Sequence, residues 1–334
     1  MKKLVAIILS LVSAVTVFAF SACGNKGDVT IKYYPDASAL LTALKENDIA
    51  LGVLAEPAAS NLEKITKDNK TWYRLDIQEL YDNETNSYPQ AVMLVKESVL
   101  KTYPQLVDSI ESKFADNTAF VAENPAQAIN KINEVFLPKG NTSTLKPAML
   151  NATVIANCNI SWQSAIDVKK AVKEYLNTII AVEKISATAA KDDLFYEGTA
   201  NGEFTADKIT VYCPDGAPAL SIAKFINDNE SFGTDKTFEY HVVNANQIGE
   251  KVEEGTGDIV ILPVNAASKL YKKFSEDPYK LVSVVTHGNL YLMCSEKITA
   301  DDLKDKNIGM FGQGQVPDLT FRAVLGKLGY NVKI

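Results

Sequence analysis

Short apolar runs alternate with segments of helical spacing along most of the chain. Residues 49–54 and 258–262 are nearly continuous apolar runs, which are typical of strands buried on both faces of a parallel sheet. Leu40, Leu41 and Leu44 instead recur at the spacing of one helical face. Repeated strand–helix–strand units of this kind predict an α/β fold with parallel sheets covered by helices. The expected strands are residues 30–34, 49–54, 72–80, 90–95, 209–213, 238–243, 258–262, 281–285, 289–294 and 307–311, and residues 100–182 are expected to be helical.

One two-part pattern occurs twice. Residues 209–220 (ITVYCPDGAPAL) and 308–319 (IGMFGQGQVPDL) share Ile, Pro and Leu at a constant offset of 99 positions. Residues 258–270 (DIVILPVNAASKL) are echoed by residues 48–62 (DIALGVLAEPAASNL). The first unit precedes the second in one copy, whereas in the other copy the first unit lies at the C-terminus and the second at the N-terminus.

The spacing of the two copies accounts for this reversed order. Asp215 and Asn244 each open a strand-to-helix turn and are 29 positions apart. Their counterparts, Gly314 and Asp36, are also 29 positions apart if the end of the chain is joined to Asp28. We therefore expect two similar α/β lobes in a circularly permuted order.

The predicted organisation has a leader and two lobes. Residues 1–27 are a lipoprotein signal and short tether, residues 28–90 with 298–334 form lobe II, and residues 91–297 form lobe I, with a helical region at 98–196 and a linker at 197–207.

The first residues resemble a secretion signal. Lys2 and Lys3 precede 17 mostly apolar residues, and the small residues Ser21 and Ala22 come directly before Cys23. This arrangement resembles the bacterial lipobox, in which the cysteine is lipidated and becomes the new N-terminus. A plain membrane anchor is the alternative, although 17 residues are slightly short for one. We expect an extracytoplasmic protein anchored to the membrane through Cys23.

The charge balance argues against nucleic acid as a partner. The chain has 34 basic and 41 acidic side chains, and removing residues 1–22 takes away two of the basic ones to leave a net charge of −9. Nucleic acid binding needs a basic surface, whereas a small anion can be held by backbone N–H groups alone. A monomer is expected.

Cysteine and histidine usage gives little support to a metal or cofactor. After Cys23 an odd number of cysteines remains, so no disulfide framework is expected. Cys213 and Cys294 lie in apolar strand-like runs, which predicts buried thiols. His241 and His287 are the two histidines, and no Cys-x-x-Cys occurs. We therefore expect no cofactor and no bound metal.

The candidate chemistry lies where the predicted strands end. In open parallel sheets, ligands bind at the carboxyl ends of strands, where loops lead into helix N-termini. Neither a phosphate-binding P-loop nor the Gly-x-Ser-x-Gly motif of hydrolases is present. Small or polar residues occupy six loops of the expected kind, at residues 35–38, 55–58, 214–218, 263–267, 286–289 and 312–317.

Each candidate also has a structural interpretation. Asp215 and Asp36 would serve equally well as helix N-caps, and Gly314 would permit a tight turn. His287 is more typical of a hydrogen-bonding loop histidine than of a catalytic base. Glu56 stands at a strand end before a helix, where it would face a cationic or hydrogen-bonding ligand or merely cap the helix.

Several of these stretches together resemble a known family. The stretches VYCPDGAPAL, ILPVNAA, VTHGN, FGQGQVPDLTF and VLAEPAAS are similar to bacterial ABC-transporter substrate-binding lipoproteins of the nitrate, sulfonate, taurine and thiamine-precursor branch. The resemblance covers nearly all of the chain after Asp28. The family pattern would start near Lys208, run to Ile334, continue from Asp28 and finish near Gly198.

The resemblance implies a type II periplasmic-binding-protein fold. Two lobes joined by crossover strands, which the resemblance places near residues 292–297 and 91–96, would close on a small molecule by hinge bending. The closed form would dock on ABC permease subunits in the membrane. The family's ligand-binding positions correspond here to Asp215, Gly216, Ala217, Asn265, Thr286, His287 and Asn289 in lobe I, and to Gln313, Gly314, Gln315, Asp36, Ser38 and Glu56 in lobe II.

The ligand class is constrained by the arginines. Arg74 and Arg322 are the two arginines of the chain, and neither lies in a candidate loop. Because a carboxylate ligand is usually clamped by arginine, an amino acid or dicarboxylate is disfavoured. A sulfonate- or nitrate-like anion held by helix N-termini fits, as does a thiamine-precursor-like heterocycle bonded to Asn, Gln and Asp side chains.

The expected function is therefore solute binding for an ABC importer, without enzymatic activity. One alternative is an enzyme on the same fold, similar to a pyrimidine-precursor synthase, which would need a nucleophile, lysine or metal among the candidate residues. The other alternative is a ligand sensor or non-binding surface protein.

Overall fold

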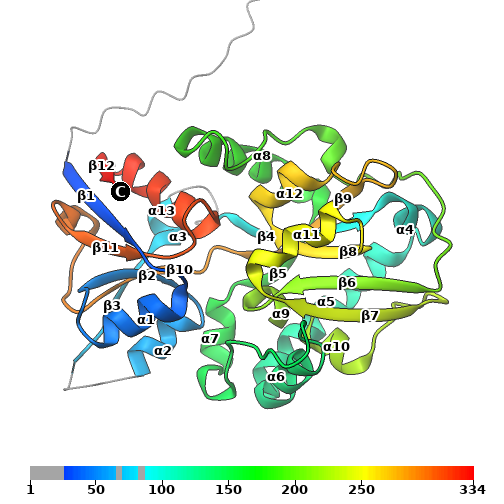
Figure 1. Cartoon of the computed structure of the whole chain (residues 1–334), viewed down its shortest axis with the longest axis horizontal. Helices are drawn as coiled ribbons and strands as arrows, with labels where there is room; N and C mark the ends of the chain where they lie inside the picture. Colours follow the sequence, from blue (N-terminus) through cyan, green and yellow to red (C-terminus); the bar gives the residue numbers. More distant parts are fainter. Residues whose placement is uncertain (1–25, 65–69, 82–86) are drawn as a thin grey trace, which may run out of the picture.

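The computed structural model describes residues 26–64, 70–81 and 87–334 and contains two six-stranded sheets with helices packed on them (Figure 1). The order of strands in sheet A is β12 (Tyr330–Lys333), β1 (Gly27–Tyr33), β11 (Asn307–Met310), β2 (Leu51–Ala55), β10 (Leu290–Cys294) and β3 (Tyr73–Asp76). The order in sheet B is β5 (Ile160–Ser164), β9 (Tyr279–His287), β4 (Pro89–Lys96), β8 (Ile259–Pro263), β6 (Lys208–Pro214) and β7 (Thr237–Val243).

Sheet A is mostly parallel, whereas sheet B is mixed. In sheet A, β10 runs antiparallel to its neighbours β2 and β3, while the other pairs are parallel. In sheet B, β4 and β5 run against the direction of β9, and β6, β7 and β8 are parallel to one another. The predicted α/β fold with two helix-covered sheets is confirmed, although three of the five neighbouring strand pairs in sheet B are antiparallel.

The two sheets share a five-strand order. Sheet A contains β1-β11-β2-β10-β3 and sheet B contains β7-β6-β8-β4-β9, with the same strand directions at matching places. In this match β11 corresponds to β6, β1 to β7 and β2 to β8. The strands that carry the repeated sequence units therefore stand at equivalent places in the two sheets.

Helices pack against both sheets. Those in contact with sheet A are α1 (Ala37–Lys45), α2 (Ala58–Lys64), α3 (Ile77–Tyr81) and α13 (Val316–Lys327). Those in contact with sheet B are α4 (Glu97–Thr102), α5 (Leu106–Glu123), α8 (Ala165–Val182), α9 (Ala217–Leu220), α11 (Ile248–Glu253) and α12 (Val264–Leu270). The helices α6 (Pro125–Glu134), α7 (Ala152–Asn157) and α10 (Ala223–Asp228) pack on α5.

Three local features differ from the predicted elements. The strand expected at residues 72–80 ends at Asp76, because its Oδ1 accepts from the backbone N of Gln78 at 2.7 Å and of Glu79 at 3.2 Å and so starts α3. The region expected to be all helical contains the strand β5. Beyond α13, Gly329 adopts a φ of +90° and the chain continues as β12, a further edge strand.

The chain changes sheet earlier than the sequence predicts. β4 pairs with β8 and β9 along its whole length, so the first crossover lies between Tyr81 and Pro89 and not at residues 91–96. β10 lies in sheet A, so the second crossover lies between His287 and Leu290 and not at 292–297. The reason is that an apolar run indicates burial but not which of two sheets it enters, and β10 (Leu290–Cys294) enters sheet A.

The two crossovers lie side by side. Pro89 is in register with His287, and the backbone N of Gly288 donates to the carbonyl of Tyr88 at 3.0 Å. The buried side chain of Gln78 holds the second crossover: its Oε1 accepts from the N of Leu290 at 2.8 Å, and its Nε2 donates to the O of Leu290 at 3.0 Å.

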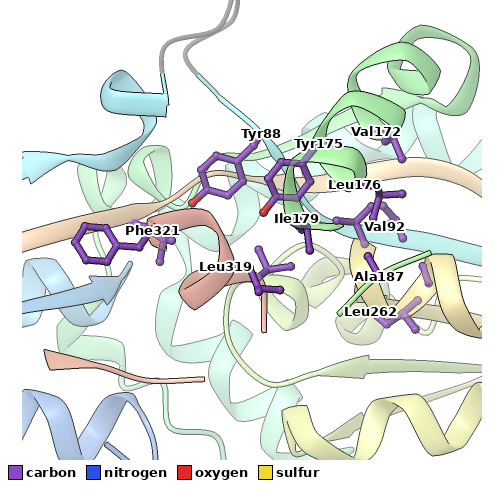
Figure 2. Packing of buried hydrophobic residues seen from close by; sticks show 14 of the residues in the cluster. Tyr88, Val92, Val172, Tyr175, Leu176, Ile179, Ala187, Leu262, Leu319 and Phe321 are labelled. Carbon is purple, nitrogen blue, oxygen red and sulfur yellow. The ribbon is translucent and has the colours of Figure 1, made fainter. Parts of the chain in front are cut away.

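One hydrophobic cluster joins the two sheets (Figure 2). Tyr88 stacks on Tyr175 of α8, with ring centroids 5.4 Å apart. The hydroxyl of Tyr175 lies 2.5 Å from Oγ1 of Thr320 on α13. The same cluster includes Leu319 of α13 and Leu262 of β8. Burial of these side chains holds α8, on sheet B, against α13, on sheet A.

We predict that Gly288→Ala destabilises the protein. A Cβ at residue 288 would lie 2.6 Å from the ring of Tyr88 and 2.8 Å from Cγ of Gln78, so the paired crossovers would have to separate. Overpacking of this kind costs about 1–3 kcal/mol, measurable by urea unfolding. Gly326→Ala in the last turn of α13 is the control: nothing lies within 4 Å of its added Cβ, and replacing this helical glycine should leave the stability unchanged or raise it by up to about 0.5–1 kcal/mol. Equal stability of Gly288→Ala and the wild type would contradict the described packing.

Candidate functional site

The loop after β6 is bonded to a distant part of the chain. The carboxylate of Asp215 accepts from Oγ of Ser143 at 2.5 Å, and from the N and Oγ1 of Thr144 at 2.8 and 2.7 Å. Gly216, with a φ of +105°, opens α9 without a side-chain cap, and Ala217 is buried in its first turn. The N-cap interpretation is therefore wrong for Asp215, whose carboxylate instead fixes the segment at 143–144.

The start of α12 is bonded to the segment that follows α8. Nδ2 of Asn265 donates to the carbonyl of Ser186 at 3.1 Å, and both residues are buried. The N of Thr188 donates to Oγ of Ser268 at 3.1 Å. Residues 183–188 therefore cross the N-terminal turn of α12; we call these residues the strap.

The strap also reaches the loop between β11 and α13. Nη1 of Arg322 lies 2.8 Å from Oε2 of Glu183, the first residue of the strap, and 3.4 Å from Oδ2 of Asp318. The same Oδ2 accepts from the N of Gly314 at 2.9 Å, while Oδ1 accepts from the hydroxyl of Tyr33 at 2.8 Å. The hydrogen bond from Arg322 lowers the pKa of Glu183. The strap thus links a candidate loop of sheet A to one of sheet B.

Glu56 is the centre of a buried polar network. Its Oε1 accepts from Oγ of Ser60 at 2.8 Å, Nη1 of Arg74 at 3.0 Å and Nδ2 of Asn157 at 3.3 Å, and its Oε2 accepts from the N of Ser60 at 3.1 Å. Its side chain is fully buried. Because Asn157 lies on α7, this network is a second polar bridge between the parts of the chain that carry the two sheets.

Thr286 and His287 stabilise the end of β9. Oγ1 of Thr286 accepts from the N of Ala91 at 3.2 Å. Nε2 of His287 lies 2.9 Å from Oε1 of Gln163, which can only accept, so Nδ1 is left to accept from Oγ of Ser161 at 3.1 Å. Burial lowers the pKa of His287 to about 4. His287 is thus a neutral bridge between β9 and β5, as its structural interpretation expects.

Asn289 lies in the second crossover and differs from the other buried candidates. It is 1 % exposed, and its carbonyl accepts from the N of Glu56 at 3.0 Å. Its side-chain Oδ1 is buried and has no hydrogen-bond partner among the residues that the structure describes.

The remaining candidates are exposed at helix starts. Asp36 is the N-cap of α1, with Oδ1 accepting from the N of Ala39 at 2.8 Å, so the capping interpretation is confirmed for this residue. Ser38 lies in the first turn of α1. Gln313 and Gln315 flank Gly314 before α13 and are exposed to solvent.

Tertiary packing brings groups to the candidate loops that the sequence analysis missed. Neither arginine lies in a candidate loop, but each reaches one through its side chain: Arg74 bonds Glu56, and Arg322 pairs with Asp318 beside Gly314. Both guanidiniums are already paired with carboxylates. No local motif marks the segment at 143–144, Asn157 or the strap, because each lies in the helical region far from its partner in sequence.

Other predictions concern thiols, metals and the leader. Cys158, Cys213 and Cys294 are buried free thiols, as expected for the last two. In residues 26–64, 70–81 and 87–334 there is no cluster of His, Cys, Asp and Glu suited to a metal. Within those ranges no helix combines the length and apolar character needed to cross a bilayer. Cys23 and the predicted signal lie outside the described residues.

Two solved structures of binding proteins have distant similarity to this chain. No family model and no curated protein matches the sequence. The oligopeptide-binding protein AppA from Bacillus subtilis, solved with a nonapeptide, has 10% identity and a TM-score of 0.32, with 81% of this chain and 57% of AppA covered. NikA from Brucella suis, solved with Fe(III)-EDTA, has 12% identity and a TM-score of 0.32, with 86% and 60% covered. The chain spans less than two thirds of either structure, and at these TM-scores neither likeness carries an argument.

We predict that acid weakens the fold through His287. Its folded pKa of about 4 lies below its ordinary value of 6.5, so between these pH values the unfolded chain binds more protons than the folded one. The free energy of unfolding should therefore fall as the pH drops from 6.5 to 4, by up to about 1.4 kcal/mol per pH unit. The control is His287→Gln, measured by urea unfolding, because carboxylates titrate in both proteins. A difference between the two proteins that stays constant from pH 7 to 4 would contradict this assignment.

We predict that Asp215→Ala releases the segment at 143–144. Removing the carboxylate leaves three donors without their acceptor, which should cost about 1–3 kcal/mol and speed amide exchange at Thr144. Asp36→Ala is the matched control: it removes a helix cap worth about 0.5–2 kcal/mol, and its faster exchange should be confined to α1. Hydrogen exchange followed by mass spectrometry distinguishes the two. Unchanged exchange at Thr144 in Asp215→Ala would refute the bridge.

Proposed function

We propose that this protein is an extracytoplasmic solute-binding protein that delivers a small molecule to an ABC importer. The observation that carries the proposal is the shared strand order of the two sheets combined with their two adjacent crossovers. Two similar α/β bodies joined by two neighbouring segments can rotate about those segments, and hinge closure of this kind captures ligands without covalent chemistry.

The proposed binding residues are the thirteen candidates at the strand ends. In parallel sheets, such loops are where ligands bind, and the candidate loops of both sheets are linked through the strap and through the network of Glu56. Solute entry would exchange some of these internal hydrogen bonds for bonds to the solute. Gln313 and Gln315 are exposed and free to make new contacts without loss of the fold.

The proposed solute is a sulfonate- or nitrate-like anion or a thiamine-precursor-like heterocycle. Because the guanidiniums of Arg74 and Arg322 are engaged by carboxylates, neither offers a free clamp for a carboxylate ligand. The exclusion of amino acids thus rests on paired arginines and not on distant ones. The neutral, doubly bonded His287 gives no support to the enzyme alternative, which would need an available base.

The chain order and membrane attachment are part of the proposal. A circular permutation places the equivalents of β6 and β7 at opposite ends of the chain, as β11 and β1, and these two strands pair in parallel. We infer that residues 28–90 and 298–334 belong to the split lobe, with β10 added to it. Lipidation of Cys23 would hold this lobe near the membrane, where ABC permease subunits are the partners.

The proposal is tested by thermal unfolding of the purified protein with sulfonates, nitrate, thiamine-like and riboflavin-like heterocycles and amino acids. A true ligand should raise Tm in a concentration-dependent way, because it binds the folded state alone. Gln315→Ala should weaken that ligand about tenfold, the loss expected for one good hydrogen bond. Gln127→Ala, an exposed change on α6, is the matched control and should bind as the wild type does. A cooperative melt that no solute shifts would count against the proposal.

A further inference from the structure

The side chain of Asn289 has an acceptor that the fold leaves unused. Its main chain is fixed, because its carbonyl accepts from the N of Glu56 at 3.0 Å and the preceding N of Gly288 donates to Tyr88. Its Oδ1 is nevertheless buried without a hydrogen-bond partner in the described parts of the chain. A buried acceptor without a partner has lost its water and gained nothing in return, so it destabilises the structure that holds it.

The other buried polar candidates contrast with Asn289. Oγ1 of Thr286 accepts a backbone hydrogen bond, and both ring nitrogens of His287 have partners. The amide of Asn265 donates to a carbonyl, and Glu56 accepts four hydrogen bonds. Internal hydrogen bonds therefore compensate for the burial of these residues, whereas no internal hydrogen bond within the described parts of the chain does so for the Oδ1 of Asn289.

The strand β4, which follows the first crossover, carries a second unused acceptor. Oε1 of Gln90 is also buried without a partner among the described residues. Gln90 follows Pro89, which is in register with His287, two positions before Asn289. One unpaired side-chain oxygen therefore lies in the second crossover and another in the strand that follows the first crossover. Each of the two oxygens is an acceptor, so a partner for either one must supply an N–H or O–H group.

We propose that Asn289 determines solute specificity by accepting a hydrogen bond from the solute. This inference rests on the proposed solute-binding function and narrows its ligand class to molecules that carry an N–H or O–H donor. Nitrate and simple alkylsulfonates offer acceptors alone and cannot satisfy the Oδ1 of Asn289. An amino-substituted heterocycle or an aminosulfonate can.

The first arm of the test needs no ligand. Asn289→Leu removes the unpaired oxygen and keeps the number and branching of the side-chain heavy atoms, so it should raise the Tm of the unliganded protein by about 2 °C or more. Thr286→Val is the matched control: it removes a bonded side chain from a site that is also fully buried and should lower Tm. A lower Tm for Asn289→Leu, similar to that of Thr286→Val, would show that Asn289 is a structural residue and overturn the inference.

The second arm compares solutes that differ in a donor. Taurine is ethanesulfonate with an added ammonium group, and 4-aminopyrimidine is pyrimidine with an added amino group. In at least one pair, the donor-bearing member should raise Tm more than its partner, and Asn289→Leu should remove that difference, with affinity reduced about tenfold. Calorimetric titration of the wild type and Asn289→Leu gives the affinities.

The outcomes separate the two claims. Equal binding by both members of a pair, or a donor preference retained in Asn289→Leu, would overturn the role of Asn289 while leaving solute binding in place. No binding by any of the four solutes would count against the proposed function, and the inference would fall with it. A donor preference lost in Asn289→Leu supports both claims.

Discussion

The structure depends on the exchange of one strand between its two sheets. β4 enters sheet B between β8 and β9, and β10 enters sheet A between β2 and β3, each immediately after a crossover. Neither sheet is complete until the chain has crossed. Backbone hydrogen bonds within sheet B hold β4, and those within sheet A hold β10, so each crossover is anchored in the sheet that it enters. The contact of Gly288 with Tyr88 keeps the crossovers together, and any relative rotation of the sheets has to occur there.

Around these crossovers the chain satisfies most of its own polar groups. Asp215 holds the segment at 143–144, Glu56 bonds Asn157, and the strap spans the starts of α12 and α13. The shared hydrophobic cluster of α8 and α13 adds apolar burial to these bridges (Figure 2). A solute that enters between the sheets therefore competes with internal contacts, and its affinity would depend on how favourably it replaces them. Asn289 differs because its Oδ1 has no internal hydrogen bond to lose in the parts of the chain that the structure describes.

Much of the architecture, but less of the site, was predictable from the sequence. The repeated units predicted which strands are equivalent, because matching apolar runs and turns occupy matching places in each sheet. The crossover positions were not predictable, because β4 and β10 have the same apolar pattern whichever sheet they join. The partners Ser143 of Asp215 and Asn157 of Glu56 were also missed, since they come from distant parts of the chain and bond through single side chains. Local patterns in the sequence indicate burial and turns, whereas the contacts of Ser143 and Asn157 depend on how the helical region packs against the loops of the two sheets.

The most direct test of the account is the distance between the two sheets with and without solute. Glu46, after α1, and Thr237, at the start of β7, are exposed and can be changed to cysteine for fluorescent labels, since Cys158, Cys213 and Cys294 are buried; Cys23 is replaced by serine. Single-molecule energy transfer should show a distance distribution that narrows and shifts when a Tm-raising solute is added. A single distance that stays the same with saturating solute would contradict solute capture by rotation about the crossovers.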